Sequence, residues 1–158
     1  MRRCRRTVGS FALMLAAAAA LAGPAADWAL HGHDLGAQRL SPLKQIEPAN
    51  VARLVPQWTW KSGVVATFQA TPIVVGRVMF VSLPFSSVAA LDAASGRELW
   101  RYRHDSRGAR LCCGPANRGV AVAGGKVYVG TVDGRLLALD ARTGKPLWDV
   151  TVADYGGG

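Results

Sequence analysis

Two stretches of the chain decide the fold: Ala90-Leu91-Asp92-Ala93-Ala94-Ser95-Gly96-Arg97-Glu98-Leu99-Trp100 and Ala138-Leu139-Asp140-Ala141-Arg142-Thr143-Gly144-Lys145-Pro146-Leu147-Trp148. They are copies of one pattern, because Asp140 follows Asp92 by 48 residues and Trp148 follows Trp100 by 48. Self-similarity at this period is typical of propellers, solenoids and repeat arrays. Several short apolar runs per copy, separated by turn residues, favour the blade of a β-propeller.

Three residue types in the repeat have predicted structural roles. Asp92 and Asp140 each precede a tight turn, where a carboxylate can accept backbone N–H bonds. Gly96 and Gly144 follow at a position that is expected to need a positive φ. The tryptophan recurs once per repeat, which favours packing between neighbouring blades over stacking on a cofactor.

From Leu54 onward the pattern is β, and no segment has a long helical period. The expected β segments are Val55–Trp60, Ile73–Val75, Val78–Leu83, Ser87–Ala93, Glu98–Arg103, Val120–Ala123, Lys126–Val132, Arg135–Asp140 and Pro146–Val152. Two repeats bury one shared interface, whereas repeat folds generally need three or more units. We therefore expect the chain to be incomplete as a folding unit.

The first 26 residues have the layout of a secretory signal peptide. A basic start that includes Arg5 and Arg6 precedes an apolar run from Val8 to Leu21, and small residues follow. The alternative is a membrane anchor, but a bilayer span needs about 20 apolar residues. We therefore expect export to the periplasm, cleavage of residues 1–26 and no stable membrane span.

Charge argues against a nucleic-acid partner. The formal net charge is +9, from 19 basic and 10 acidic residues. Four of the arginines lie in the expected signal peptide, which leaves 15 basic against 10 acidic residues, or +5. These basic residues are scattered, without the dense stripe and interleaved aromatics of a nucleic-acid surface.

Residues 27–54 are expected to form an irregular arm before the blades of residues 55–158. A short helical turn is expected near Asn50–Leu54, with Asn50 as its cap. His31 and His33 could bind a metal, but with no third ligand nearby we interpret them, like His104, as polar arm residues.

The unusual segment is Cys112-Cys113-Gly114-Pro115-Ala116-Asn117-Arg118-Gly119. An exported protein folds where disulfides persist, and cleavage would leave these two cysteines. Adjacent Cα atoms are about 3.8 Å apart, which is below the usual disulfide range of about 4.4–6.8 Å. The residues alone leave two alternatives open, a strained vicinal disulfide and two free or separately bonded thiols.

The Trp repeats and the Cys-Cys-x-x-x-Asn-Arg-Gly segment resemble the pyrroloquinoline quinone (PQQ) dependent alcohol and methanol dehydrogenases. The arm, with Gln38-Arg39-Leu40-Ser41-Pro42-Leu43, is similar to theirs as well. The resemblance implies an all-β, eight-bladed β-propeller of which this chain is the N-terminal part. It also implies the oxidation of an alcohol with PQQ and calcium, and a c-type cytochrome as the electron acceptor.

The resemblance assigns roles to four residues. Cys112 and Cys113 would form a vicinal disulfide that packs on one face of the quinone. Arg118 would hold an anionic edge of PQQ, and Gln69 stands where many relatives carry a cofactor-contacting glutamate. The calcium ligands and the catalytic aspartate of the family are expected beyond residue 158, so we expect no catalytic or metal-binding residue in this chain and no activity from it alone.

Two other classes of protein share the Trp repeats. Propeller scaffolds of outer-membrane assembly are not enzymes, but they are lipoproteins with a cysteine at the cleavage site, and Cys4 lies in the basic start instead. PQQ-dependent sugar dehydrogenases of the membrane begin with several transmembrane helices. The paired cysteines and the single short apolar run favour the alcohol dehydrogenase branch.

Overall fold

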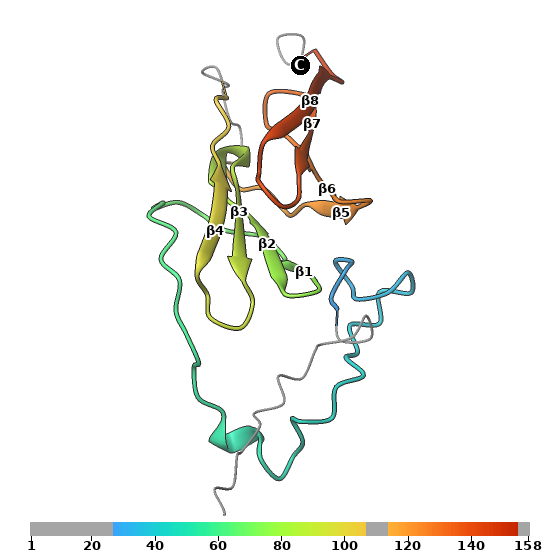
Figure 1. The fold of residues 1–158 in the computed structure, drawn as a ribbon, viewed down its shortest axis with the longest axis vertical. Coiled ribbons are helices and arrows are strands. Elements are labelled where there is room, and N and C mark those ends of the chain that lie inside the picture. The colour runs from blue at the N-terminus through green and yellow to red at the C-terminus, as the bar shows by residue number, and fades with distance from the viewer. Residues whose placement is uncertain (1–26, 107–113, 155–158) are drawn as a thin grey trace, which may run out of the picture.

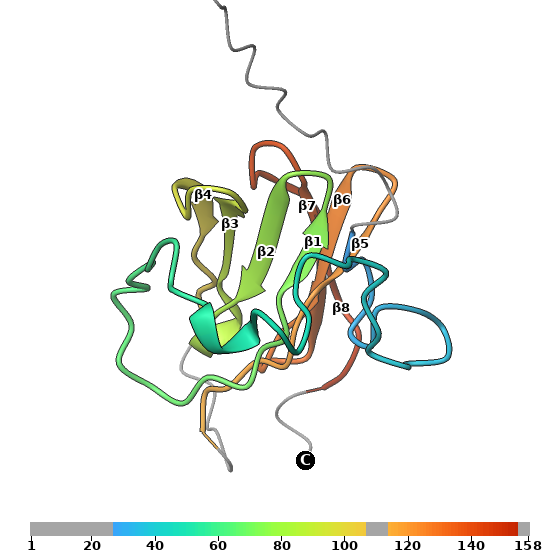
Figure 2. The same cartoon turned by 90° about the horizontal axis from the view of Figure 1, so that it is seen from below.

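The computed structural model describes residues 27–106 and 114–154, which form two four-stranded antiparallel sheets. The first contains β1 (Ile73–Val75), β2 (Val78–Ser82), β3 (Val88–Asp92) and β4 (Glu98–Tyr102), and the second contains β5 (Ala121–Ala123), β6 (Lys126–Gly130), β7 (Arg135–Asp140) and β8 (Pro146–Thr151). In each sheet the strands pair in chain order, as in a propeller blade. The two sheets lie next to each other (Figures 1 and 2), which confirms the predicted fold class.

The predicted β segments after residue 72 are strands, with ends that differ by at most two residues. Val55–Trp60 was also expected to be β, and this prediction is wrong because these residues form no strand. A strand needs a hydrogen-bonded neighbour, and nothing in the described ranges pairs with 55–60. The segment is ordered by its side chains instead.

The turns between β3 and β4 and between β7 and β8 have the predicted chemistry. The Asp92 carboxylate accepts the backbone N–H of Ser95 at 2.9 Å and the Ser95 hydroxyl at 2.8 Å. Asp140 accepts the same pair from Thr143, both at 2.8 Å. The glycine that follows each pair has φ near +70°, 71° at Gly96 and 72° at Gly144.

Gly144 receives a tryptophan from β4, the outer strand of the first sheet. The Trp100 indole N–H donates to the Ala141 carbonyl at 3.0 Å, and its ring lies on Gly144. A Cβ on Gly144 would lie only 2.5 Å from the Trp100 Cε3 atom. The predicted packing of Trp100 between blades is therefore confirmed, and the glycine is needed for space as well as for its backbone conformation.

Trp58 makes the same contact with the first sheet, which the sequence pattern had not revealed. Its indole N–H donates to the Ala93 carbonyl at 3.2 Å, and a Cβ on Gly96 would lie 2.4 Å from its ring. Trp58 and Trp60 pack on a buried cluster that includes Leu83 and Leu91. The segment Val55–Trp60 thus covers the outer face of the first sheet without being a strand.

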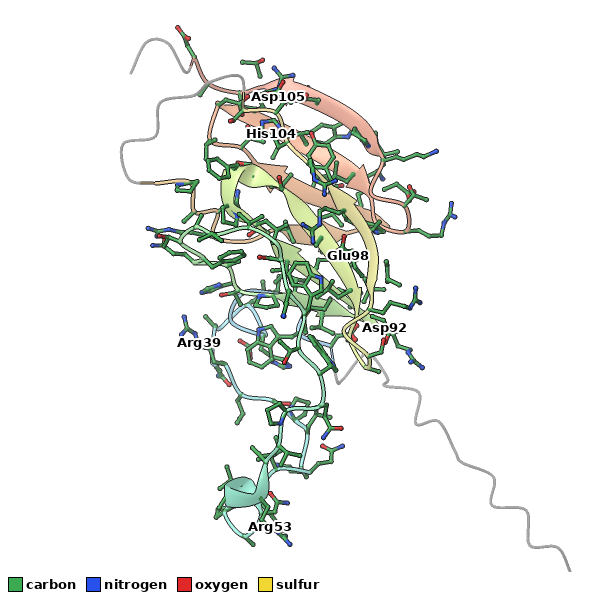
Figure 3. All side chains as sticks on the ribbon, turned by 90° about the vertical axis from the view of Figure 1, so that its left-hand side faces the viewer. Arg39, Arg53, Asp92, Glu98, His104 and Asp105 are labelled. Carbon is green, nitrogen blue, oxygen red and sulfur yellow. The ribbon has the colours of Figure 1, made fainter. Side chains whose placement is uncertain are left out.

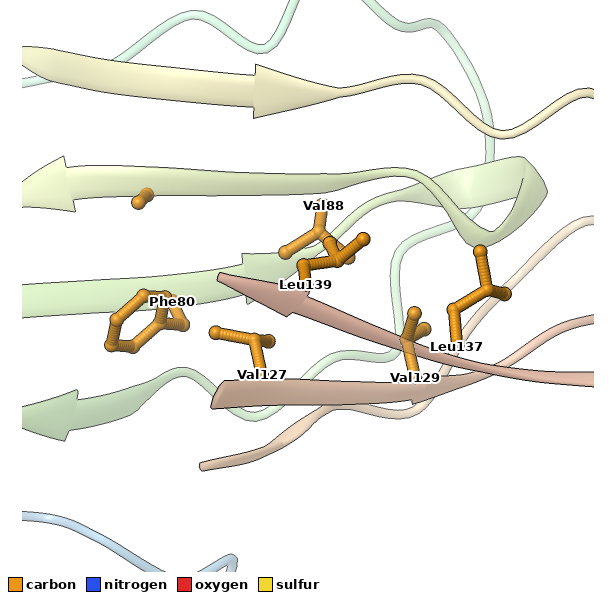
Figure 4. Close-up of a cluster of buried hydrophobic side chains, with 7 residues drawn as sticks. Phe80, Val88, Val127, Val129, Leu137 and Leu139 are labelled. Atoms are coloured by element: carbon orange, nitrogen blue, oxygen red, sulfur yellow. The ribbon is translucent and has the colours of Figure 1, made fainter. Parts of the chain in front are cut away.

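The main core lies between the two sheets. Its buried members, shown in Figure 4, are Phe80, Val88, Ala90, Val127, Val129, Leu137 and Leu139. Trp100 packs against them. Members alternate along β3, β6 and β7, so each of these strands turns one set of side chains to this interface. Burial of this apolar interface holds the two blades side by side.

The arm caps the inner edge of the first sheet. Trp28 and Val74 exchange backbone hydrogen bonds of 2.8 and 2.9 Å, and the Asp27 carboxylate accepts the N–H of Gly76 at 2.8 Å. The chain then extends away from the sheets and returns along the far side of β4 (Figure 1). Edge strand β1 therefore has part of its open edge covered.

The expected turn near Asn50 is a short 3-10 helix, η2 (Val51–Arg53). The predicted cap is wrong, because the Asn50 side chain makes no hydrogen bond to the turn. Its amide oxygen accepts the N–H of Glu47 at 3.0 Å, and its amide nitrogen donates to Gln45 at 2.8 Å. Asn50 thus fixes the loop that leads into η2. The predicted signal peptide lies outside the described residues.

Candidate functional site

An open cavity of about 510 Å³ lies where β1 and β5 begin. These are the inner strands of the two sheets, and they contact each other. The cavity wall includes Thr71 and Ile73 on one side and Asn117, Arg118 and Gly119 on the other. The connection from β4 to β5 therefore brings Arg118 to the inner edge of both blades.

Asn117 anchors this connection. Its amide nitrogen donates to the Gly130 carbonyl at 2.9 Å, and its amide oxygen accepts the N–H of Gly119 at 3.0 Å. The backbone carbonyl of Asn117 accepts the hydroxyl of buried Ser82 at 3.3 Å. Both sheets thus hold the residue next to Arg118, which explains structurally why an asparagine stands there.

Gly119 brings the backbone close to the start of β1. Its φ of +144° lies in a region that favours glycine, and a Cβ there would lie 3.6 Å from the Thr71 carbonyl. The Thr71 N–H donates to the Arg118 carbonyl at 3.5 Å. The Asn-Arg-Gly sequence therefore forms a backbone bridge between the two inner strands, with the Arg118 side chain left exposed.

The cavity is lined by hydrogen-bond donors and by positive charge. Arg118 makes no side-chain hydrogen bond or ion pair within the described ranges, and none of the described lining residues is Asp or Glu. His31 lies on the wall, and the Arg39 guanidinium approaches its Nε2 atom at 3.3 Å. A guanidinium without a partner beside amide and hydroxyl groups suits an anionic ligand.

The other predicted site residues are placed differently. Gln69 is exposed two residues before Thr71, and it is not part of the described cavity wall. Cys112 and Cys113 lie outside the described residues, so their pairing remains a prediction. Of the four residues, the structure brings only Arg118 to the cavity, together with Asn117 and Thr71, which the sequence did not single out as ligands.

His104 was interpreted as a polar arm residue, and this interpretation is wrong. It follows β4, and its Nε2 atom lies 2.8 Å from the Asp133 carboxylate in the turn between β6 and β7. Both side chains are buried, with 4% and 7% of their surface exposed. Figure 3 shows His104 beside the second sheet, far from Arg53 of the arm. His31 and His33 do lie in the arm, as expected.

The protonation states around His104 are set by burial and hydrogen bonds. Burial raises the pKa of Asp133, but hydrogen bonds from Thr131 and His104 outweigh burial and hold that pKa below its usual value. Burial, then the carboxylates of Asp149 and Asp133, raise the pKa of Tyr102, whose hydroxyl lies 3.3 Å from His104 Nδ1. With a proton on Nε2, the His104 ring donates to Asp133 and its Nδ1 atom accepts from the Tyr102 hydroxyl.

The described ranges contain no group of three His, Cys, Asp or Glu side chains that could hold a metal ion. Among the same residues, no helix is long and apolar enough to cross a membrane. The candidate site in this part of the chain is therefore the cavity beside Arg118.

Comparison with known proteins gives this cavity a family context. Residues 28–153 match the PQQ family described as "Glucose/ethanol/alcohol dehydrogenase, beta-propeller domain". The chain is 45% identical over 148 residues to a 1-butanol dehydrogenase (cytochrome c) of Thauera butanivorans, which covers 92% of this chain and 21% of the relative. The chain thus spans about a fifth of the length of that curated relative.

Solved structures agree with this assignment. The quinohemoprotein alcohol dehydrogenase ADHIIG of Pseudomonas putida superimposes with a TM-score of 0.78 and 46% identity, covering 82% of this chain and 19% of that chain. A europium-containing methanol dehydrogenase superimposes with a TM-score of 0.75 and 35% identity, covering 85% and 24%. In each case this chain corresponds to a minor part of a larger propeller.

Proposed function

The chain belongs to the PQQ-dependent glucose, ethanol and alcohol dehydrogenase β-propellers, and on this premise we propose that it forms part of an exported, calcium-dependent alcohol dehydrogenase. The observation that carries the proposal is the unpaired Arg118 guanidinium on a cavity wall with no acidic residue among its described members. The Thauera relative is named for 1-butanol and cytochrome c, which supports an alcohol substrate and a c-type cytochrome as electron acceptor.

The residues present fit PQQ, which is a planar, polycarboxylate quinone. Arg118 would bind a carboxylate or a quinone oxygen, for which a guanidinium is well suited. Asn117 would hold Arg118 in place through its bonds to Gly130 and Gly119. Gln69, two residues from the wall, would offer a neutral hydrogen bond, and Cys112 and Cys113 would supply a disulfide against one face of the ring system.

The bound quinone would supply the oxidising chemistry, by accepting a hydride from the alcohol carbon while the alcohol proton passes to a base. As the family resemblance implies, we place the base and the calcium ligands beyond residue 158, in the rest of the protein. Calcium is our proposal for the metal, although one similar structure contains europium. The activity proposed is that of the whole protein, whose periplasmic location would follow from the predicted signal peptide.

The proposal is tested by binding PQQ to the complete polypeptide as the gene encodes it, stripped of cofactor and given Ca²⁺. Replacing Arg118 with Ala should weaken PQQ binding by about tenfold or more, because a charged hydrogen-bond partner is lost. Arg53→Ala is the matched control, since Arg53 lies in η2 and is not among the described residues that line the cavity. Equilibrium dialysis gives the dissociation constant.

The same protein is then assayed for oxidation of primary alcohols and of glucose, with Ca²⁺ or Eu³⁺ and an artificial electron acceptor. We expect alcohol oxidation that requires PQQ. A wild-type protein that binds no PQQ would refute the proposal. Oxidation of glucose but not of alcohols would assign the protein to the sugar dehydrogenases instead.

A further inference from the structure

The connection between β4 and β5, which ends in the Arg118 segment, is fixed at both ends to one hairpin of the second sheet. At its start, His104 bonds to Asp133 at 2.8 Å. At its end, Asn117 bonds to Gly130 at 2.9 Å. Gly130 ends β6 and Asp133 lies in the turn that follows, so a single turn of the second sheet contacts the connection near its start and near its end.

The same turn is also tied to the first sheet. The N–H of Val132 donates to the hydroxyl oxygen of Ser86 at 3.0 Å, and Ser86 is completely buried. Ser86 belongs to the 3-10 helix η3 (Pro84–Ser86), in which Phe85 donates its N–H to the Pro115 carbonyl at 2.8 Å. The turn, η3 and the connection thus form one hydrogen-bonded unit across the two blades.

Within this unit, His104–Asp133 is the buried polar contact that involves a carboxylate. Burial of an ionised carboxylate costs free energy unless the carboxylate is hydrogen-bonded. Burial of Asp133 therefore favours the conformation in which His104 contacts it. Tyr102 and the Ser87 hydroxyl, which accepts the backbone N–H of His104 at 3.3 Å, hold the histidine from its own side. These contacts hold the His104 side chain in place against Asp133, as a positioning contact requires.

We propose that His104 and Asp133 are positioning residues for Arg118: their contact fixes the turn between β6 and β7, whose Gly130 carbonyl accepts from Asn117, and so holds Arg118 at the cavity. The inference rests on the proposed function, because it concerns the affinity of the same cavity for PQQ. His104 lines a separate cavity of about 320 Å³, so it would act through this turn and not by touching the cofactor.

The test is a double-mutant cycle on the complete polypeptide, read out as the dissociation constant and dissociation rate of PQQ. His104→Phe keeps the ring shape and removes both hydrogen bonds, and it should weaken PQQ binding by about tenfold. The same change in an Arg118→Ala background should alter binding by less than about twofold, because the contact acts through Arg118. A merely structural role would not depend on Arg118.

Two further variants keep the test decisive. Asp133→Asn can still accept from His104 but without its charge, so it should weaken binding by about threefold, and it serves if His104→Phe does not fold. Asp140→Asn is the matched control: Asp140 accepts the N–H of Thr143 at 2.8 Å in the turn between β7 and β8, at the opposite end of β7 from Asp133, and the change should leave PQQ binding unchanged.

The outcomes separate the inference from the proposed function. If wild-type protein binds no PQQ, the proposed function fails. If wild-type protein binds PQQ and both folded variants bind it equally well, or His104→Phe weakens binding to the same extent with and without Arg118, the positioning role is overturned while the proposed function stands. Loss of thermal stability without a change in PQQ affinity would also overturn it.

Discussion

The two sheets are built from the same parts, yet within the described ranges only the first is covered on both faces. β2 pairs with β3, and β6 with β7, in the same register, and both sheets have an irregularity at the equivalent position of the outer strand pair. Trp58 and the second sheet cover the first sheet. In the second sheet every residue of β8 is exposed, and Trp148 keeps 38% of its surface exposed.

This difference separates what a blade encodes locally from what it receives from its neighbour. The Asp140 turn closes as completely as the Asp92 turn, so the turn needs no neighbour. Trp148, in contrast, contacts Tyr128 of its own sheet, and no described residue accepts its indole N–H. Trp148 thus occupies the place in its sheet that Trp100 occupies in the first sheet, but no glycine among the described residues receives its ring.

The largest expected effect concerns the two docked tryptophans. Replacing either Trp58 or Trp100 with Ala should lower the free energy of unfolding by about 3 kcal/mol, because each removes a large ring and a hydrogen bond. The two losses should agree within about 1 kcal/mol if the docks are equivalent. Urea unfolding of the complete polypeptide, followed by far-ultraviolet circular dichroism, measures them, and a negligible loss at Trp58 would break the equivalence.

The glycine side of the dock should be nearly as sensitive. Gly144→Ala combines a positive φ with a Cβ that would clash with Trp100, and it should cost about 2–4 kcal/mol. Gly124→Ala is the matched control, because Gly124 also has a positive φ, +54°, but nothing within 4 Å of an added Cβ. It should cost about 1 kcal/mol. Equal losses in the two variants would argue against a tight dock.

A smaller effect is expected where the first sheet bonds the turn of the second. Ser86→Ala leaves the Val132 N–H without its acceptor in a buried place, which should cost about 1–2 kcal/mol. Ser41→Ala removes a similar bond in the exposed arm, to the N–H of Leu43, and should cost less than about 0.5 kcal/mol. Comparable unfolding curves for the two variants would contradict the inter-blade role of Ser86.

The smallest effect concerns the two aspartate turns and pH. Hydrogen bonds from the side chain and backbone of Thr143 hold the pKa of Asp140 below its usual value, and those from Ser95 do so for Asp92. This stabilisation is complete above the unfolded pKa of about 3.9 and is lost as the pH falls through the lower folded value. Asp140→Asn should therefore weaken the loss of stability between pH 5 and 2, measured by urea unfolding at each pH. An unchanged pH dependence would show that the turn does not titrate as the hydrogen bonds imply.

Much of the fold could be predicted because its determinants are local. The Asp92 and Asp140 turns, with their glycines, are fixed by residues within five positions of each other. The hairpin strands follow from these turns and from the apolar runs. Val55–Trp60 was mispredicted because its aromatic side chains pack on the first sheet, while its backbone joins no sheet. The local sequence does not indicate whether a partner strand lies beside this segment.

The site was less predictable because its contacts are distant in sequence. Arg118 drew attention through its motif, but its place on the cavity depends on Asn117 bonding to Gly130, 13 residues away. His104 meets Asp133 across 29 residues, and nothing near either residue indicates the other. The sequence does contain a signal for Trp58. Gln57-Trp58 precedes a repeat, as Leu99-Trp100 does, although no Asp-containing turn comes before it.

The docked tryptophan also gives each blade a polarity. Trp100 projects from the outer strand of one sheet, and Gly144, on which its ring lies, belongs to the next sheet. Each repeat therefore carries a tryptophan on one side and a receiving glycine on the other. Such a contact is heterologous, because the two sheets contribute different surfaces to it, so two sheets related by a two-fold axis could not form it. A gene segment that encodes one repeat encodes both the tryptophan and the receiving glycine. Duplication or loss of a whole repeat therefore leaves every tryptophan with a glycine to pack on. A propeller of this kind can change its blade number in evolution while keeping the same interface between blades.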